Sequence, residues 1–260
     1  MDDVVGESAV QYSARWPHLS RPPVIEALID IAVEAREGID DVQIEALFPA
    51  ESVGFYLKGN LVEGMFTFGV APEGSAVTPA SDVRVVGRRY HSRDEKFVLQ
   101  LRPDRFVLSR LAPYESWNKL VEEARRVWKV YVESVSPIQT VRVAVRYINS
   151  VTTPTVVATQ WNAHLRKVGD LPEGIPATVE THFQRTQIVN SARDARVVLS
   201  IAIEPGPSAV LNTTIDIDAF SELHLSCADD RIWNRLAKLR DLKNLVFFKT
   251  LAEKTIEDMQ

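Results

Sequence analysis

Residues 106–120 read FVLSRLAPYESWNKL, a strand-like apolar run that leads through a proline-containing turn into a helical pattern. Trp117 and Leu120 begin an apolar stripe at helical spacing, which continues until Pro137 ends the helix. Residues 213–236 repeat this order, since the strand pattern TTIDIDAF is followed by DDRIWNRL. In both stretches a strand leads into a helix that carries a tryptophan early on.

The segments around these two stretches also match in their order. Alternating or β-rich apolar runs predict strands at residues 24–33, 63–71, 82–91, 95–102, 104–112, 139–151, 178–190, 195–204 and 209–218. Helical patterns predict helices at about residues 42–48, within 112–137, at 156–168 and at 229–259. Pro103 and Asp104 form a short turn, which makes the strands on either side of it an antiparallel hairpin.

This order predicts an α+β fold of two pseudo-repeated antiparallel sheets, each backed by a long helix. The halves are residues 21–137 and 138–260, expected to form one compact unit after a flexible N-terminal segment of residues 1–20. Coincidence is the alternative to true duplication, because the halves share a pattern and no measurable identity.

Composition narrows the class of protein. The chain has 260 residues, of which 45% are hydrophobic, and a formal net charge of -5, so no global positive field attracts nucleic acid. Cys227 is the single cysteine, which excludes an internal disulfide and a cysteine-rich zinc site. No apolar run reaches the roughly 18 residues of a membrane span. We therefore expect a bacterial-type protein of the reducing cytoplasm.

Strand alternation gathers polar side chains on one face of the predicted sheets. Arg142 and Arg146 are the natural cross-strand partners of Glu26 and Asp30 if their two strands pair. In the second half, the same alternation of side chains places His182 and Asn212 on a polar face of the sheet. One interpretation is a solvated sheet surface, and the other is a groove that receives a partner or a small polar ligand.

Asp216 and Asp218 are the candidate metal ligands, with His182 as a third. Two carboxylates two residues apart on a strand point the same way and can hold Mg or Mn for chemistry on phosphate esters or nucleotides. The sequence shows no phosphate-holding glycine loop, no HExxH and no CxxC motif. Cys227 follows His224 by three residues, a spacing that does not establish a thiol and its base.

A basic stretch from Arg84 to Lys96 is the candidate for nucleic-acid contact. Arg84, Arg88 and Arg89 lie near Tyr90, a mixture that nucleic-acid binders use for phosphate contact and stacking. A charged sheet edge that discourages aggregation is the preferred interpretation in an acidic chain.

The apolar C-terminal segment predicts docking onto the fold or onto a second subunit, so a homodimer is one alternative. Its apolar seam consists of Ile232, Leu236, Leu239, Leu242 and Leu245.

The stretches RPPVIEALIDI (21–31), LSRLAPYESW (108–117), RVAVRYIN (142–149) and IDID (215–218) resemble a sporadically distributed bacterial family of uncharacterised proteins of similar length. The resemblance covers nearly the whole chain and brings no established catalytic residues. Scattered distribution implies an accessory genetic module, such as one for defence or toxin neutralisation.

Three functions follow as hypotheses. The first is a non-enzymatic protein-interaction module without a cofactor, antitoxin-like or defence-associated, whose acidic surface complements a basic partner. The second is the metal-dependent enzyme acting through Asp216 and Asp218. The third is the nucleic-acid binder. The missing catalytic motifs favour the first.

Overall fold

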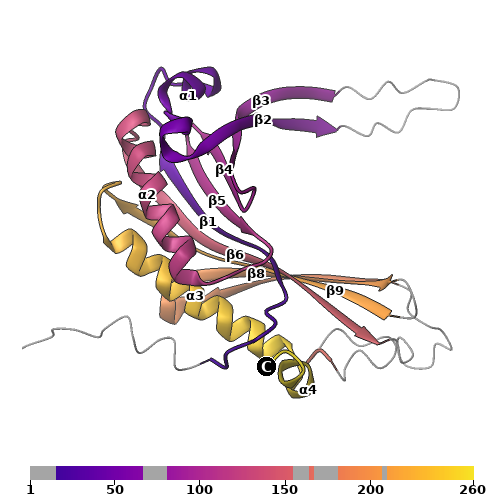
Figure 1. The fold of residues 1–260 in the computed structure, drawn as a ribbon. Coiled ribbons are helices and arrows are strands. Elements are labelled where there is room, and N and C mark those ends of the chain that lie inside the picture. Colours follow the sequence, from indigo (N-terminus) through magenta and orange to yellow (C-terminus); the bar gives the residue numbers. More distant parts are fainter. Residues whose placement is uncertain (1–15, 67–80, 155–163, 167–180, 207–209) are drawn as a thin grey trace, which may run out of the picture.

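The computed structural model describes residues 16–66, 81–154, 164–166, 181–206 and 210–260. Its strands form one antiparallel sheet in the order β2-β3-β4-β5-β1-β6-β9-β8-β7 (Figure 1). The strands are β1 (Val24–Glu34), β2 (Phe55–Phe66), β3 (Ser81–Ser92), β4 (Phe97–Arg102), β5 (Arg105–Leu111), β6 (Gln139–Pro154), β7 (His182–Asn190), β8 (Ala195–Gly206) and β9 (Val210–Leu225). The helices are α1 (Asp41–Leu47), α2 (Trp117–Val135), α3 (Arg231–Thr250) and α4 (Glu253–Glu257), with short 3₁₀ turns at Ala50–Val53 and Ser191–Arg193.

The prediction of two sheets, each backed by its own long helix, was wrong. β1 pairs with β6 from Val24 opposite Asn149 to Glu34 opposite Gln139, and this pairing joins the two halves into a single sheet. On their other sides, β1 pairs with β5 and β6 pairs with β9. An unpaired strand edge exposes backbone N–H and C=O groups, and the β1–β6 pairing satisfies both of these edges.

The two long helices cover one face of this sheet (Figure 1). Helix α2 packs over β1 and β5, whereas α3 packs over β6 and β9. Alternate residues of the central strands turn toward these helices and are buried: Ala27, Ile29, Ile31, Val143, Val145, Ile215, Ile217 and Ala219. The residues between them face the other side of the sheet, which is where most of the predicted polar residues lie.

Local signals place the helices of the first half where the sequence predicts them. Asp40 caps α1 by accepting hydrogen bonds from the backbone N–H groups of Val42 and Gln43, and the Gln43 side chain accepts one in return. Ser116 caps α2, and the helix ends at Val135. Ser136 follows in the left-handed conformation, with a φ of 51°, and Pro137 comes next. The predicted hairpin across Pro103 and Asp104 is also confirmed, as β4 and β5.

The C-terminal apolar seam docks onto the fold. Ile232, Leu236, Leu239 and Leu242 of α3 are buried in the core. The predicted helix over residues 229–259 is broken at Leu251, which pairs with Leu165 before α4 begins. Most of the helix predicted at residues 156–168 and the end of the strand predicted at residues 63–71 lie outside the described residues.

Of the helices that the structure describes, none has the length and apolar character needed to span a lipid bilayer.

Gly87 in β3 marks a close approach between strands and gives a first test of the fold. A Cβ added there would lie 2.3 Å from the carbonyl oxygen of Leu101, whereas one added at Gly59 in β2 would meet nothing within 4 Å. We expect Gly87→Ala to lower the free energy of unfolding by roughly 1 to 3 kcal/mol, because β3 or β4 must move. Urea denaturation measures this, and Gly59→Ala is the matched control. Equal stability of the two variants would contradict the close β3–β4 approach.

Candidate functional site

Charged side chains from four neighbouring strands pair with one another on the face of the sheet opposite α2 and α3. We call this set the charge ladder, and its members are Arg105 of β5, Asp30 of β1, Arg142 and Arg146 of β6, and Asp216 and Asp218 of β9. Asp30 lies between the core residues Ile29 and Ile31, so alternation turns its side chain to this face.

Asp30 is the centre of the ladder. Arg105 donates to both of its carboxylate oxygens, with 2.8 Å from Nε to Oδ1. Arg142 donates from Nη1 to Oδ2 of Asp30 at 3.0 Å and from Nη2 to Oδ2 of Asp218 at 3.3 Å. Arg142 therefore bridges β1 and β9, and Asp30 is only 6% exposed. The guanidinium of Arg142 also lies 4.4 Å from the ring centroid of Phe220.

Arg146 makes the second part of the ladder. Its Nε and Nη2 atoms donate to Oδ1 and Oδ2 of Asp216 at 2.8 and 2.6 Å, a two-pronged pair that uses both carboxylate oxygens. The hydrogen bonding to Asp216 raises the pKa of the Arg146 guanidinium above its ordinary value. Asp218 stands directly opposite Arg146 in the β6–β9 register.

Register explains why these residues meet. In the sheet, Asp30 is opposite Ala144, so the Arg142 side chain reaches it diagonally across the β1–β6 pair. Arg105 is opposite Ala32 and reaches Asp30 along the other diagonal. Burial raises the pKa of Asp218, an effect that Arg142 opposes and the neighbouring Asp30 carboxylate reinforces.

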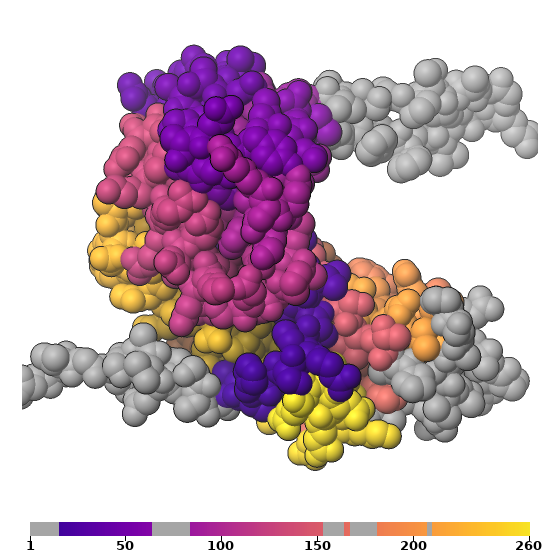
Figure 2. Space-filling model, in the orientation of Figure 1, coloured from indigo at the N-terminus to yellow at the C-terminus, as the bar shows by residue number. Residues whose placement is uncertain are grey.

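A cleft of about 330 Å³ lies against the ladder. Its walls are Leu28, Asp30, Leu61, Val62, Glu63, Val86, Gln100, Arg102, Arg105, Val107, Arg146 and Asp218. In Figure 2 the molecular surface is indented on the right, between the β2–β3 strands and the strands of the second half. Arg102 pairs with Asp104 at 3.0 Å and also with Glu63, so this part of the cleft is charge-paired as well.

The structure brings together only some of the predicted groove residues. Asp30, Arg142 and Arg146 lie in the ladder, and Glu26 contributes to the negative field around Arg146. Asn212 lies farther along β9, where its Oδ1 accepts a hydrogen bond from Thr152 at 3.1 Å. His182 is on β7, at the end of the strand order, opposite Ile203. The predicted groove residues therefore do not form one site.

Sequence reasoning missed Arg105, Arg102 and Glu63. Arg105 begins β5, and the alternation of side chains along that strand places it on the polar face. This alternation was visible in the sequence and could have identified Arg105. Glu63 of β2 could not have been found, because it pairs with Arg102 of β4, two strands away in the sheet, and local patterns do not give the strand order.

The three candidate metal ligands are not arranged as a metal site. Both oxygens of Asp216 accept from Arg146, and His182 lies two strands away on β7, about 10 Å by strand spacing alone. No group of three or more His, Cys, Asp and Glu side chains close enough to hold a metal ion occurs in the described part of the chain.

The three candidate nucleic-acid contacts do not share one surface. Arg88 is 6% exposed and pairs with Glu45 at 2.7 Å and with Asp41 at 3.1 Å, so it ties α1 to β3. Arg89 points to the opposite side of β3 and is exposed. Arg84 is exposed and lies 4.0 Å from Glu63.

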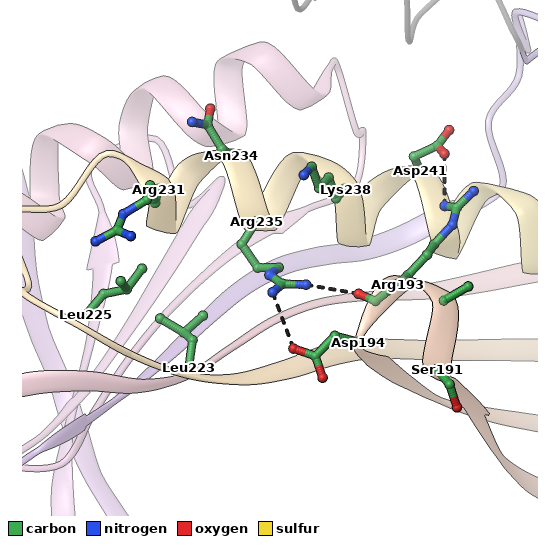
Figure 3. A pocket seen from close by; sticks show the side chains of 11 residues that line it. Ser191, Arg193, Asp194, Leu223, Leu225, Arg231, Asn234, Arg235, Lys238 and Asp241 are labelled. Carbon is green, nitrogen blue, oxygen red and sulfur yellow. Dashed lines mark hydrogen bonds and ion pairs between the residues drawn. The ribbon is translucent and has the colours of Figure 1, made fainter. Parts of the chain in front are cut away.

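A larger groove, of about 860 Å³, lies between α3, the β7–β8 turn and the end of β9 (Figure 3). Arg193 pairs with Asp241 at 3.0 Å, and Arg235 pairs with Asp194 at 3.4 Å while donating to the carbonyl oxygen of Arg193 at 2.9 Å. These contacts fasten the β7–β8 turn to α3, so we assign the charges of this groove to holding the fold together. Only Lys238 of its cations has no carboxylate within ion-pair distance among the described residues.

Neither a known protein-family model nor a curated protein matches this chain, so the family resemblance inferred from the sequence stays a prediction.

Proposed function

We propose that this chain is a non-enzymatic protein-interaction module of the bacterial cytoplasm, which binds a segment of a partner protein in the cleft beside the charge ladder. The observation that carries the proposal is the mutual pairing of the charges in that cleft. Arg105, Asp30 and Arg146 line it, and each already has an oppositely charged partner.

Such pairing suits binding better than catalysis. A general base or metal ligand needs a carboxylate oxygen that is free to take a proton or an ion. In the ladder, both oxygens of Asp30 and of Asp216 already accept from arginine. Arginine cannot act as the base itself, because its guanidinium stays protonated. Two of the three ladder carboxylates are therefore fully engaged, whereas Asp218 accepts from Arg142 through Oδ2 alone.

The apolar parts of the cleft suit a protein segment. Leu28, Leu61, Val86 and Val107 line it beside the paired charges, and the centres of protein interfaces are more apolar than the rest of the surface. Val62 at its rim is 60% exposed. The net charge of the whole chain, -5, favours a partner with a basic surface. A toxin-neutralising or defence role is the form of the proposal that the sequence resemblance suggests.

Val62→Asp tests the proposal without touching the ladder. Tagged wild-type chain and variant are expressed in the organism of origin, and the proteins that co-purify are quantified by mass spectrometry. We expect the specific partner to be captured at least about tenfold less by the variant, because a buried carboxylate would face the apolar wall of the cleft. Light scattering of the purified chain tells whether the partner is a second copy.

Val42→Asp is the matched control, since Val42 is 62% exposed and lies on α1 outside the cleft. It should capture the partner as the wild type does. Loss of the partner in both variants, or in neither, would place the interaction elsewhere. A chain that captures nothing above background would remove the proposal.

A further inference from the structure

A separate cavity of about 270 Å³ lies beside α3, between that helix, the start of β1 and the loop after β5. Aromatic rings of Trp16, Tyr114, Tyr147 and Phe247 form much of its wall. None of the described residues that line it is an aspartate or a glutamate. It therefore differs from the cleft and the groove above, where carboxylates neutralise the cations.

Lys243 is the unusual member of this cavity. Its side chain is buried, with 7% exposure, and its Nζ lies 3.6 Å from the ring centroid of Tyr147 and 6.0 Å from that of Phe247. Within the part of the chain that the structure describes, it has neither a hydrogen-bond partner nor a carboxylate within 4.0 Å. Lysine is almost never buried in this way unless it is paired.

Two neighbours add polar groups that make no hydrogen bond or ion pair with the described residues. Asn244 is 8% exposed, and its side-chain amide makes no hydrogen bond to the described residues. Arg240 lies over the Trp117 ring, 5.8 Å from its centroid, and makes no ion pair with them. Lys243, Asn244 and Arg240 therefore bring hydrogen-bond donors to one cavity, and none of the residues that the structure describes accepts from them.

The other titratable groups around Lys243 do not supply the missing negative charge. The Tyr114 and Tyr147 hydroxyls are 2.7 Å apart and bond to each other, and burial raises the pKa of both. Asp241 on the same helix accepts from Trp16 at 2.9 Å and from Arg193 at 3.0 Å. His18 lines the cavity from the N-terminal segment. Burial, reinforced by Arg240, lowers the pKa of Lys243 to about 7.

We propose that this cavity binds a small organic carboxylate with a flat aromatic body. The carboxylate accepts from Lys243, Arg240 and Asn244, and the ring packs among the aromatic side chains. The cavity is near the lower end of the size range of ligand pockets, which limits the ligand to a small molecule. This site shares no residue with the cleft, so it stands independently of the proposed protein interaction.

Binding of a carboxylate should be coupled to the uptake of a proton by Lys243. Above pH 7 the free chain holds Lys243 largely uncharged, and a bound anion favours the ammonium form. At pH 8.5 the complex should therefore take up a proton from the buffer, whereas near pH 6 it should not. Calorimetry in two buffers of different ionisation enthalpy measures this uptake directly.

Benzoate is the probe for the test, with benzamide and benzylamine as neutral and cationic analogues. We expect benzoate to bind the full-length chain with a Kd on the order of 1 mM or lower. The analogues should bind at least about tenfold more weakly, and the proton uptake should appear with benzoate alone. Lys243→Met should weaken benzoate binding about tenfold and abolish the uptake.

Lys238→Met on the exposed side of the same helix is the control and should bind benzoate like the wild type. The melting temperature of each variant confirms that it is folded. The proposal is overturned if benzoate and benzamide bind equally, if benzoate does not bind at all, or if Lys243→Met binds it unchanged. Tighter binding of phenyl phosphate than of benzoate would overturn the assignment to carboxylates.

Discussion

Lys243→Met should stabilise the protein at neutral pH by about 4 kcal/mol, because one pKa unit corresponds to about 1.4 kcal/mol. The folded chain holds Lys243 at a pKa of about 7, below the 10.5 of a lysine in water. Between these two values the unfolded chain binds a proton that the folded chain does not. The contribution of Lys243 to the free energy of unfolding of the wild type therefore rises with pH across this window and is lowest below pH 7, where the folded chain must carry the buried ammonium.

The measurement is urea denaturation of wild type and Lys243→Met at several pH values from 6 to 10, with the difference between them taken at each pH. Taking the difference removes the titration of all other groups. The advantage of the variant should be largest at pH 6 and should shrink as the pH approaches 10. Lys238→Met should differ little from the wild type at every pH, because Lys238 is exposed. A difference that does not change with pH would show that Lys243 is not held in a desolvated state.

Alternation along the strands could be predicted from the sequence, and with it the shared face of the ladder residues. His182 was predicted on that face too, but it stands opposite the buried Ile203 and so lies on the other face of the sheet. Asp30 and Arg142 were predicted as cross-strand partners if their strands paired, and the structure places their atoms 3.0 Å apart. Arg146 was expected to pair with the first strand as well, yet it pairs with Asp216 of β9. Local periodicity gives the face of a side chain, but the identity of its neighbour depends on strand order.

The order of the strands in the sheet could not be predicted from the sequence. Pairing between β1 and β6 joins segments more than a hundred residues apart, and no local pattern distinguishes such a partner from a free edge. The same limit hid the cavity beside α3. Lys243 is four residues from both Leu239 and Phe247, within the buried stripe of the helix, and this spacing was a signal. What could not be predicted is that no carboxylate of the described residues lies within ion-pair distance of Lys243.

Asp30→Asn should lower the free energy of unfolding by about 3 kcal/mol, because it leaves two arginines without their shared carboxylate. Asp30 is 6% exposed, whereas the side chains of Arg105 and Arg142 are 41% and 23% exposed and can recover part of the loss from water. Urea denaturation measures the effect. Glu222→Gln is the control, since its pair with Arg196 lies in solvent and should contribute at most about 1 kcal/mol.

A paired replacement separates two roles of the ladder. Asp30→Leu combined with Arg142→Met removes both charges at the centre, and an apolar pair of similar size is often as stable as the buried ion pair that it replaces. We expect the double variant to recover only part of the stability that Asp30→Asn loses, because Arg105 and Asp218 each lose an ion-pair partner. If it also keeps the proposed partner, the ladder serves only to fix the register of β1 against β6. If it folds but loses the partner, the paired charges are themselves part of the binding surface. A double variant less stable than Asp30→Asn would instead show that the ion pairs contribute net stability to the sheet.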